Sequence, residues 1–172
     1  DSKRVMKECQ RLLNIDDKML SHKTLLHEIS HAKDSLISPE DYLNDAGDDV
    51  RLRKIGEAYR LYEKLLRDAD AMDFDDMIVN TVKLLEENEE VRTRYQNRFR
   101  YVMVDEYQDT NHAQYRLTSL LAGGSGNLCV VGDDDQSIYR FRGATIENIL
   151  SFEEQYHKAK VIRLEQNYRS TQ

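Results

Sequence analysis

The chain has 172 residues, of which 40% are hydrophobic, which is enough for one domain with a hydrophobic core, or for a core and a smaller appendage. The formal net charge of −7 excludes a generally basic coat for nucleic acid, so any such contact has to be local. No run approaches the roughly 18 apolar residues of a membrane span, and the N-terminal residues lack the apolar core of a secretory signal, so we expect a cytoplasmic protein without membrane contacts.

Apolar residues recur at spacings of three and four through the first part of the chain, a pattern typical of amphipathic helices. Helices are expected near residues 5–13, 25–36, 51–72 and 75–87, with a further turn starting at 38–40. Asp73, with Asp76 three residues later, is the expected N-cap of the helix at 75–87. A supporting role near an active site is the alternative for these two acids and for Asp75. Residues 1–98 are therefore predicted to be all helical.

The run RTRYQNRFR at residues 92–100 holds four arginines and no acid. A charge run of this kind is more often a solvated face than a binding stripe, so a nucleic-acid contact here is a secondary hypothesis.

After residue 98 the pattern changes to short runs rich in β-branched residues. Strands are expected at residues 101–104, 127–131 and 160–164, with helices near 113–121 and 145–156 between them. This alternation is typical of a parallel sheet, in which ligands bind at the carboxyl ends of the strands. Polar clusters follow all three strands, at residues 105–106, 133–136 and 165–169. Cys129, inside the second strand, is expected to be a small buried residue without a redox or zinc role.

Asp105 and Glu106 directly follow the first expected strand. An Asp in this position can hold a hydrated magnesium ion, and the next Glu can orient or deprotonate a water for attack on a terminal phosphate. A charged strand end without chemistry is the alternative. The phosphate-binding sequence G-x-x-x-x-G-K-[ST], which such a site needs, does not occur in the chain.

The run YVMVDEYQDTN at residues 101–111 resembles motif II of the UvrD/PcrA/Rep family of superfamily 1 DNA helicases. The run VVGDDDQSIYRFRGA at 130–144 looks like motif III, LEQNYRS at 164–170 like motif IV, and AMDFDDMI at 71–78 like the segment before motif II. The resemblance implies an α/β fold: a partial RecA-like P-loop NTPase sheet, lacking the Walker A strand, in residues 99–172. Residues 1–98 are similar to the helical accessory subdomain inserted in the first motor domain.

The resemblance also implies roles at an ATP site. Asp105 would bind Mg²⁺, and Glu106 would be the catalytic base. Gln136 would sense the terminal phosphate, Arg169 would contact it, and Tyr168 would stack on the adenine. A strand-end cap is the alternative for Gln136, and a surface position on the following loop is the alternative for the other two.

Tyr139 and Phe141 alternate with Arg140 and Arg142, an arrangement that suits a platform for single-stranded DNA. The alternative is that both rings are buried in the core. The family commonly has Trp where this chain has Phe141, so stacking there is expected to be weaker. The implied partners are single-stranded DNA and junctions of single-stranded with duplex DNA.

We therefore expect an internal part of an ATP-dependent 3′–5′ DNA helicase acting in DNA repair or replication, with the polarity resting on the resemblance. The Walker A segment and the second motor domain would lie outside the chain, which alone is expected to be inactive. A non-catalytic DNA- or protein-binding module is the alternative. A metal-dependent phosphatase using Asp133 and Asp135 is the third alternative.

In the family's sheet, the Walker A strand lies between the motif III and motif IV strands. Without it, strand 160–164 has no neighbour, and an unpaired edge invites association. We expect this strand to close onto strand 127–131, or to exchange into a second copy of the chain.

Overall fold

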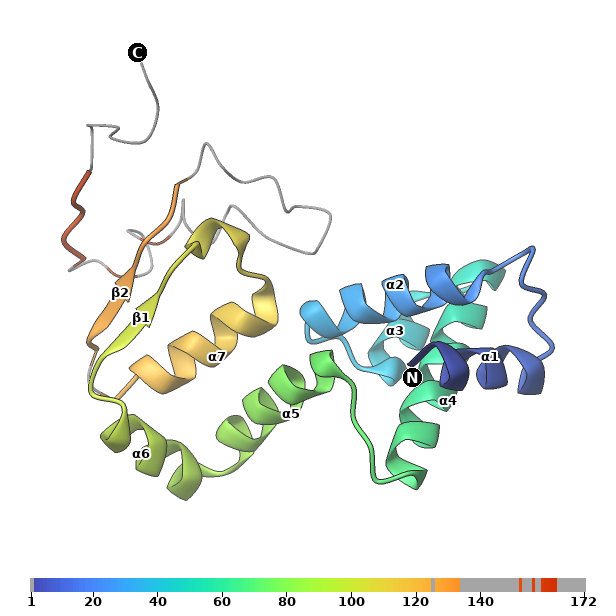
Figure 1. Cartoon of the computed structure of the whole chain (residues 1–172), viewed down its shortest axis with the longest axis horizontal. Helices are drawn as coiled ribbons and strands as arrows, with labels where there is room; N and C mark the ends of the chain where they lie inside the picture. Colours follow the sequence, from blue (N-terminus) through green and yellow to red (C-terminus); the bar gives the residue numbers. More distant parts are fainter. Residues whose placement is uncertain (1, 125, 134–151, 153–155, 157–158, 164–172) are drawn as a thin grey trace, which may run out of the picture.

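The computed structural model describes residues 2–124, 126–133, 152, 156 and 159–163. Within these residues the chain is mostly helical, with one two-stranded parallel sheet. Figure 1 shows two groups of elements side by side: helices α1 to α4, and helices α5 to α7 with strands β1 and β2. None of the helices in these residues is both long and apolar enough to cross a membrane.

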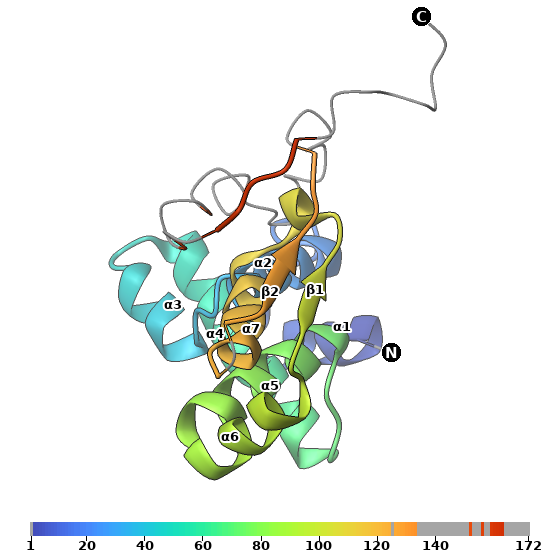
Figure 2. The same ribbon diagram turned by 90° about the vertical axis from the view of Figure 1, so that its left-hand side faces the viewer.

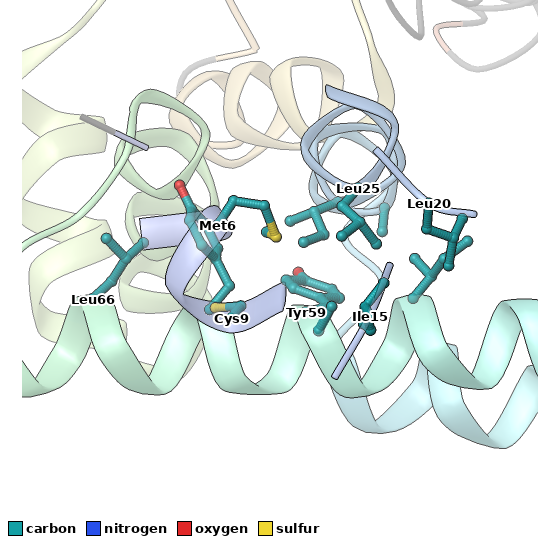
Figure 3. Packing of buried hydrophobic residues seen from close by; sticks show 12 residues of the cluster. Met6, Cys9, Ile15, Leu20, Leu25, Tyr59 and Leu66 are labelled. Carbon is teal, nitrogen blue, oxygen red and sulfur yellow. The ribbon is translucent and has the colours of Figure 1, made fainter. Parts of the chain in front are cut away.

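The first group comprises α1 (Ser2–Leu12), α2 (His22–Asp34), α3 (Pro39–Asp45) and α4 (Val50–Asp68). Their apolar faces share one core, in which Met6 and Cys9 of α1 meet Leu25 of α2 and Tyr59 of α4 (Figure 3). The buried residues of α4 recur every three or four positions, as the sequence predicts for an amphipathic helix. The helical character expected of this part of the chain is therefore confirmed.

The helix expected at residues 51–72 ends earlier, at Asp68. Asp70 has a φ of 48°, in the left-handed region, and the backbone N–H of Ala71 donates to Leu66 O at 2.9 Å. This is the hydrogen bonding of a helix C-terminus, and it turns the chain away from the α4 axis. Met72 therefore lies outside the helix and is 61% exposed, although its spacing places it on the apolar face.

The second group begins with α5 (Phe74–Glu87) and α6 (Glu89–Arg98). Asp73 and Asp76 form the expected N-terminal cap: each side chain accepts from the other residue's backbone N–H, at 2.9 and 3.0 Å. Both helices pack against α7 (His112–Ala122), and α5 also touches α2. The two helices thus connect the all-helical group to the sheet.

Strands β1 (Val102–Val104) and β2 (Leu128–Val130) pair in parallel, with Val104 opposite Val130, and α7 connects them. Two of the expected strands, their pairing and the helix between them are confirmed. The third is wrong: residues 160–163 form no strand and do not pair with β2, and Ile162 is 71% exposed. An apolar run needs a partner to become a strand, and the described residues supply none. Most of the helix expected at 145–156 lies outside the described residues.

One face of the sheet rests on α7, and Figure 2 looks onto the other face. Successive side chains of a strand point to opposite faces, so Met103 and Cys129 share the face away from α7. Met103 is 75% exposed and Cys129 is also exposed. The expectation that Cys129 is buried is therefore wrong, because no other described element covers its face of the sheet.

Candidate active site

The carboxyl ends of β1 and β2 lie at the same edge of the sheet, because the two strands are parallel and in register. Backbone pairing continues past the strands: Val131 N–H donates to Val104 O at 2.8 Å, and Tyr107 N–H donates to Val131 O at 2.9 Å. The polar residues that follow each strand are thereby brought together. Asp105 and Glu106 follow β1, as the sequence predicts. Asp133, the one described residue of the expected cluster at 133–136, follows β2.

Glu106 has a left-handed backbone, with φ 50° and ψ 44°. A non-glycine residue in this region is uncommon and costs conformational energy, and such residues cluster at functional sites. The Glu106 N–H donates to Asp105 Oδ1 at 2.9 Å, so the first carboxylate holds the turn that the second one makes. The turn leads into a short 3₁₀ helix, Tyr107–Asp109, and leaves both carboxylates exposed.

Gln108 follows this pair in the 3₁₀ helix and is only 1% exposed. Its Nε2 donates to Glu106 Oε2 at 2.7 Å, and its Oε1 accepts from the backbone N–H of Asp133 at 3.0 Å. One buried amide therefore joins the ends of both strands. Sequence reasoning missed this residue, whose signal is an amide two positions after the acidic pair.

Tyr107 anchors the same turn in the interior. It is fully buried, and its ring meets the ring of Phe152 edge to face, with 5.7 Å between centroids. Burial, and to a lesser extent neighbouring Tyr156 and Tyr115, raises the pKa of Tyr107 to about 12, so its hydroxyl stays neutral at physiological pH. This residue supports the turn and has no expected part in proton transfer.

Asn111 connects the end of the acidic turn to α2. Its Oδ1 caps α7 by accepting from Gln114 N–H at 2.9 Å, and its Nδ2 donates to Asp34 Oδ1 at 2.6 Å. Burial, and then the charge of Asp75, raises the pKa of Asp34 from an ordinary 3.8 to about 6. The charged form of Asp34 is therefore disfavoured in the folded protein, although Asn111 donates to it.

We predict that Asp34→Asn stabilises the protein more at pH 7 than at pH 4. A carboxyl whose pKa is raised on folding binds more protons when folded, so its cost grows as pH rises from about 3.8 to about 6 and persists above that window. Asparagine removes this cost and keeps an oxygen for Asn111. Thermal unfolding midpoints at both pH values would measure the difference.

The matched control is Asp45→Asn, because Asp45 also ends a helix but is exposed. It corrects for the change in net charge and for the helix dipole. Equal gains for the two variants at both pH values would contradict the role of burial at Asp34.

A second charged cluster joins α2, α4 and α5. The Nζ of Lys33 lies 2.6 Å from Asp76 Oδ1, 2.7 Å from Glu63 Oε1 and 2.9 Å from Asp73 Oδ2. Three carboxylates this close could hold a metal ion, but here the ammonium of Lys33, which is 1% exposed, lies among them. Asp73 and Asp76 are thus helix-start acids that also bind a buried lysine.

Two arginines of the run at residues 92–100 make contacts within the fold. Arg92 Nη1 donates to Leu85 O at 2.8 Å at the end of α5, and the guanidinium of Arg98 lies 6.0 Å from the centre of the Phe99 ring. These contacts agree with the favoured interpretation of a helix surface. Binding of nucleic acid by this run stays a prediction.

The acidic turn has the chemistry that a magnesium ion needs. Mg²⁺ takes oxygen ligands, commonly one or two carboxylates together with water and phosphate oxygens. Asp105 offers an exposed carboxylate, one oxygen of which accepts from Glu106 N–H. The described residues therefore fit a site at which Asp105 would hold the ion and leave the neighbouring Glu106 free to contact a water.

The other site residues predicted from the sequence lie outside the described residues. They are Gln136, Tyr139, Phe141, Arg142, Tyr168 and Arg169. Their predicted roles are therefore not tested by this geometry.

The matches to known proteins span both the helical part of the chain and the acidic turn. The family model for the UvrD/REP helicase N-terminal domain matches residues 1–157. The chain is 50% identical over 171 residues to the ATP-dependent DNA helicase PcrA of Staphylococcus epidermidis, and 48% identical to that of Staphylococcus aureus. These matches cover 99% of the chain but 23% of each relative, so the chain spans about a quarter of their length.

Proposed function

We propose a function from one premise: the chain belongs to the UvrD/REP helicase family. We propose that it forms part of an ATP-dependent DNA helicase that moves 3′ to 5′ on single-stranded DNA and unwinds duplexes during DNA repair or replication. The observation that carries the proposal is the exposed Asp105-Glu106 pair, which follows a strand of a parallel sheet and lies beside the end of the second strand. Two relatives that are 50% and 48% identical to this chain over the matched residues are named ATP-dependent DNA helicase PcrA.

The chemistry proposed for the site is hydrolysis of the terminal phosphate of ATP. A bound Mg²⁺ would neutralise phosphate charge there, and Asp105 is the residue proposed to hold it. Glu106 is proposed to orient the attacking water and to accept its proton, since its carboxylate is exposed at the turn and held by a hydrogen bond from Gln108.

Further residues complete the proposed ATP site from outside the described residues. Gln136 and Arg169 are proposed to contact the terminal phosphate, for which the charged, forked donors of arginine are well suited. Tyr168 is proposed to stack on the adenine. A RecA-like sheet, completed by a Walker A segment and faced by a second motor domain, would place all of these groups around one nucleotide.

The proposed DNA contact is the alternating aromatic and basic run after β2. Tyr139 and Phe141 would stack on bases, and Arg142 would meet a phosphate, on single strands and at junctions with duplex DNA. We also propose residues 1–98 as the accessory helical subdomain and 99–172 as part of the motor domain. The last two helices of the first part would then support the motor domain, since α5 and α6 pack against α7.

The proposed function is tested with the complete native protein that contains this sequence. We expect it to hydrolyse ATP when single-stranded DNA is present and to unwind a duplex with a 3′ single-stranded tail but not one with a 5′ tail. Unwinding of the 5′-tailed duplex alone would overturn the polarity. DNA binding without any ATP hydrolysis would favour the alternative, a non-catalytic binding module.

The 172-residue chain by itself is predicted not to hydrolyse ATP measurably. Positioning dominates phosphoryl transfer, and the chain has no Walker A sequence to hold the phosphates against Asp105 and Glu106. The measurement is phosphate release by the purified chain with single-stranded DNA, and the control is its Glu106→Gln variant. Release above that control would show that the chain forms a working site without the loop.

A further inference from the structure

Gln108 differs from the acids beside it in being almost completely buried, at 1% exposure. A buried amide has two donors and an acceptor to satisfy, and leaving them without partners is costly. The Gln108 side chain uses both ends: Nε2 donates to Glu106 Oε2 at 2.7 Å, and Oε1 accepts from Asp133 N–H at 3.0 Å. The orientation of the amide is therefore fixed by one partner from each strand end.

We propose that Gln108 is the positioning residue for the catalytic carboxylate. In this proposal, which rests on the proposed role of Glu106 as the base, the amide holds the Glu106 carboxylate at a fixed place relative to the end of β2. The reacting water would then meet a carboxylate whose direction is set before ATP binds. Gln108 itself is buried and would not contact the water or the nucleotide.

The exposed position of Glu106 explains why its side chain needs such support. The residue is left-handed and lies at the surface, where a long side chain otherwise samples many rotamers. A hydrogen bond from a buried group restricts those rotamers without adding a charge. An amide can also donate to a carboxylate with one end and accept from a backbone N–H with the other.

Through its second hydrogen bond, to Asp133 N–H, Gln108 connects the proposed base to the segment proposed to sense phosphate and contact DNA. Asp133, whose N–H donates to Gln108, lies three residues before Gln136 in the sequence. A displacement of the β2 end would therefore be passed through one side chain to the Glu106 carboxylate. This contact gives Gln108 a role that a residue merely filling the core would not have.

The first test measures DNA-stimulated ATP hydrolysis by the complete native protein. Gln108→Leu keeps the approximate size of the side chain and removes both hydrogen bonds. We expect kcat to fall about 10-fold to 100-fold, the effect of a small misplacement of a catalytic group, with KM for ATP within about twofold. Gln108→Glu, which cannot donate when ionised and places a second negative charge beside Glu106, is expected to lose at least as much.

A double-mutant cycle separates positioning from general damage. In a Glu106→Gln background the base is already absent, so adding Gln108→Leu is expected to change kcat by less than about twofold. The matched control is Gln114→Leu, which also removes a glutamine hydrogen bond near the turn but does not touch Glu106. It is expected to keep wild-type kcat.

The second test does not depend on activity. Amide hydrogen exchange at Asp133 in the complete protein is expected to be at least about tenfold faster in Gln108→Leu than in wild type, while exchange within α7 stays unchanged. Unchanged exchange at Asp133 would overturn the bridge between the strands.

The outcomes separate this proposal from the function on which it rests. A wild-type protein without DNA-stimulated ATP hydrolysis would overturn the proposed function and the positioning role together. An active wild type whose Gln108→Leu variant keeps its kcat would overturn the positioning role alone. A further loss of more than tenfold in the Glu106→Gln background would do the same, because Gln108 would then act through something other than Glu106.

Discussion

Replacing Glu106 by glutamine is expected to slow ATP turnover by the complete native protein about 10²-fold to 10⁴-fold, the usual contribution of a positioned base. The amide has nearly the same shape as the carboxylate, and its oxygen can still accept from Gln108 Nε2, which lies 2.7 Å from Glu106 Oε2 in the wild type. What the variant lacks is a group that takes a proton from the attacking water. Steady-state hydrolysis with saturating single-stranded DNA measures the loss in kcat.

The matched variant is Asp105→Asn, at the other acid of the turn. Asp105 is proposed to hold Mg²⁺, so this change is expected to weaken the binding of the magnesium–nucleotide complex, whereas Glu106→Gln is expected to leave it near wild type. Titration with a fluorescent ATP analogue, with and without Mg²⁺, compares the two. An equal loss of nucleotide affinity in both variants would make Glu106 a ligand and not a base.

Most of the helices could be predicted because helix formation depends on neighbours in the sequence. The spacing of Ile55, Tyr59, Tyr62 and Leu66 matches one helical face, and the cap at Asp73 needs only Asp76, three residues away. The residue at which α4 ends was harder to predict from the sequence. Asp70 takes a left-handed conformation, which Asp tolerates. The presence of an Asp in the sequence does not by itself predict that conformation.

Strands and buried polar groups were harder to predict because their environment comes from distant parts of the chain. Residues 160–163 have the composition of a strand but no partner among the described residues. Cys129 lies in an apolar run, yet its face of the sheet is uncovered by any described element. For the same reason Gln108 and Lys33, whose partners lie 25 and 43 residues away, were not found from the sequence.

Lys33→Met is expected to destabilise the protein by about 3–5 kcal/mol at pH 7, the usual result of removing one partner from a buried ionic cluster. Methionine can fill the space of the side-chain stem, but it leaves the carboxylates of Glu63, Asp73 and Asp76 close together without a cation. The cluster joins α2, α4 and α5, so its loss should destabilise the packing of these three helices. Urea unfolding followed by circular dichroism measures the change in free energy of unfolding.

The pH dependence follows from the pKa directions. Burial by itself would lower the pKa of Lys33, but hydrogen bonds to Asp76, Glu63 and Asp73 outweigh burial and raise it. Its stabilising contribution is therefore fully present below the ordinary value of 10.5 and is lost only as pH rises through the higher folded value. Across the neutral and acidic range the lysine stays charged, so the pH dependence of the variant reports on the carboxyl groups.

The pKa shifts of Glu63 and Asp73 predict that Lys33→Met destabilises the protein less in acid than at neutral pH. Burial raises the pKa of Glu63, and Lys33 opposes that rise; burial also acts on Asp73, but the hydrogen bonds from Lys33 and others lower its pKa overall. The wild type gains stability from the charged form of Asp73 above pH 3.8 and loses it as pH falls through the lowered folded value. Without Lys33 the folded carboxyl groups would take up protons more readily, so the difference between variant and wild type should be smaller at pH 4.5 than at pH 7.

Two further variants test whether the buried charge of the cluster is the cause of the destabilisation expected for Lys33→Met. Lys64→Met removes an exposed lysine whose Nζ lies 3.9 Å from Asp68 Oδ2. We expect the free energy of unfolding to change by less than about 1 kcal/mol. Adding Asp76→Asn to Lys33→Met removes one of the unpaired charges and should restore part of the lost stability, even if the single variant folds too poorly to measure at pH 7. If Lys33→Met proved no more harmful than Lys64→Met, or if Asp76→Asn deepened the defect, the cluster would owe its stability to packing around the lysine stem and not to its charge.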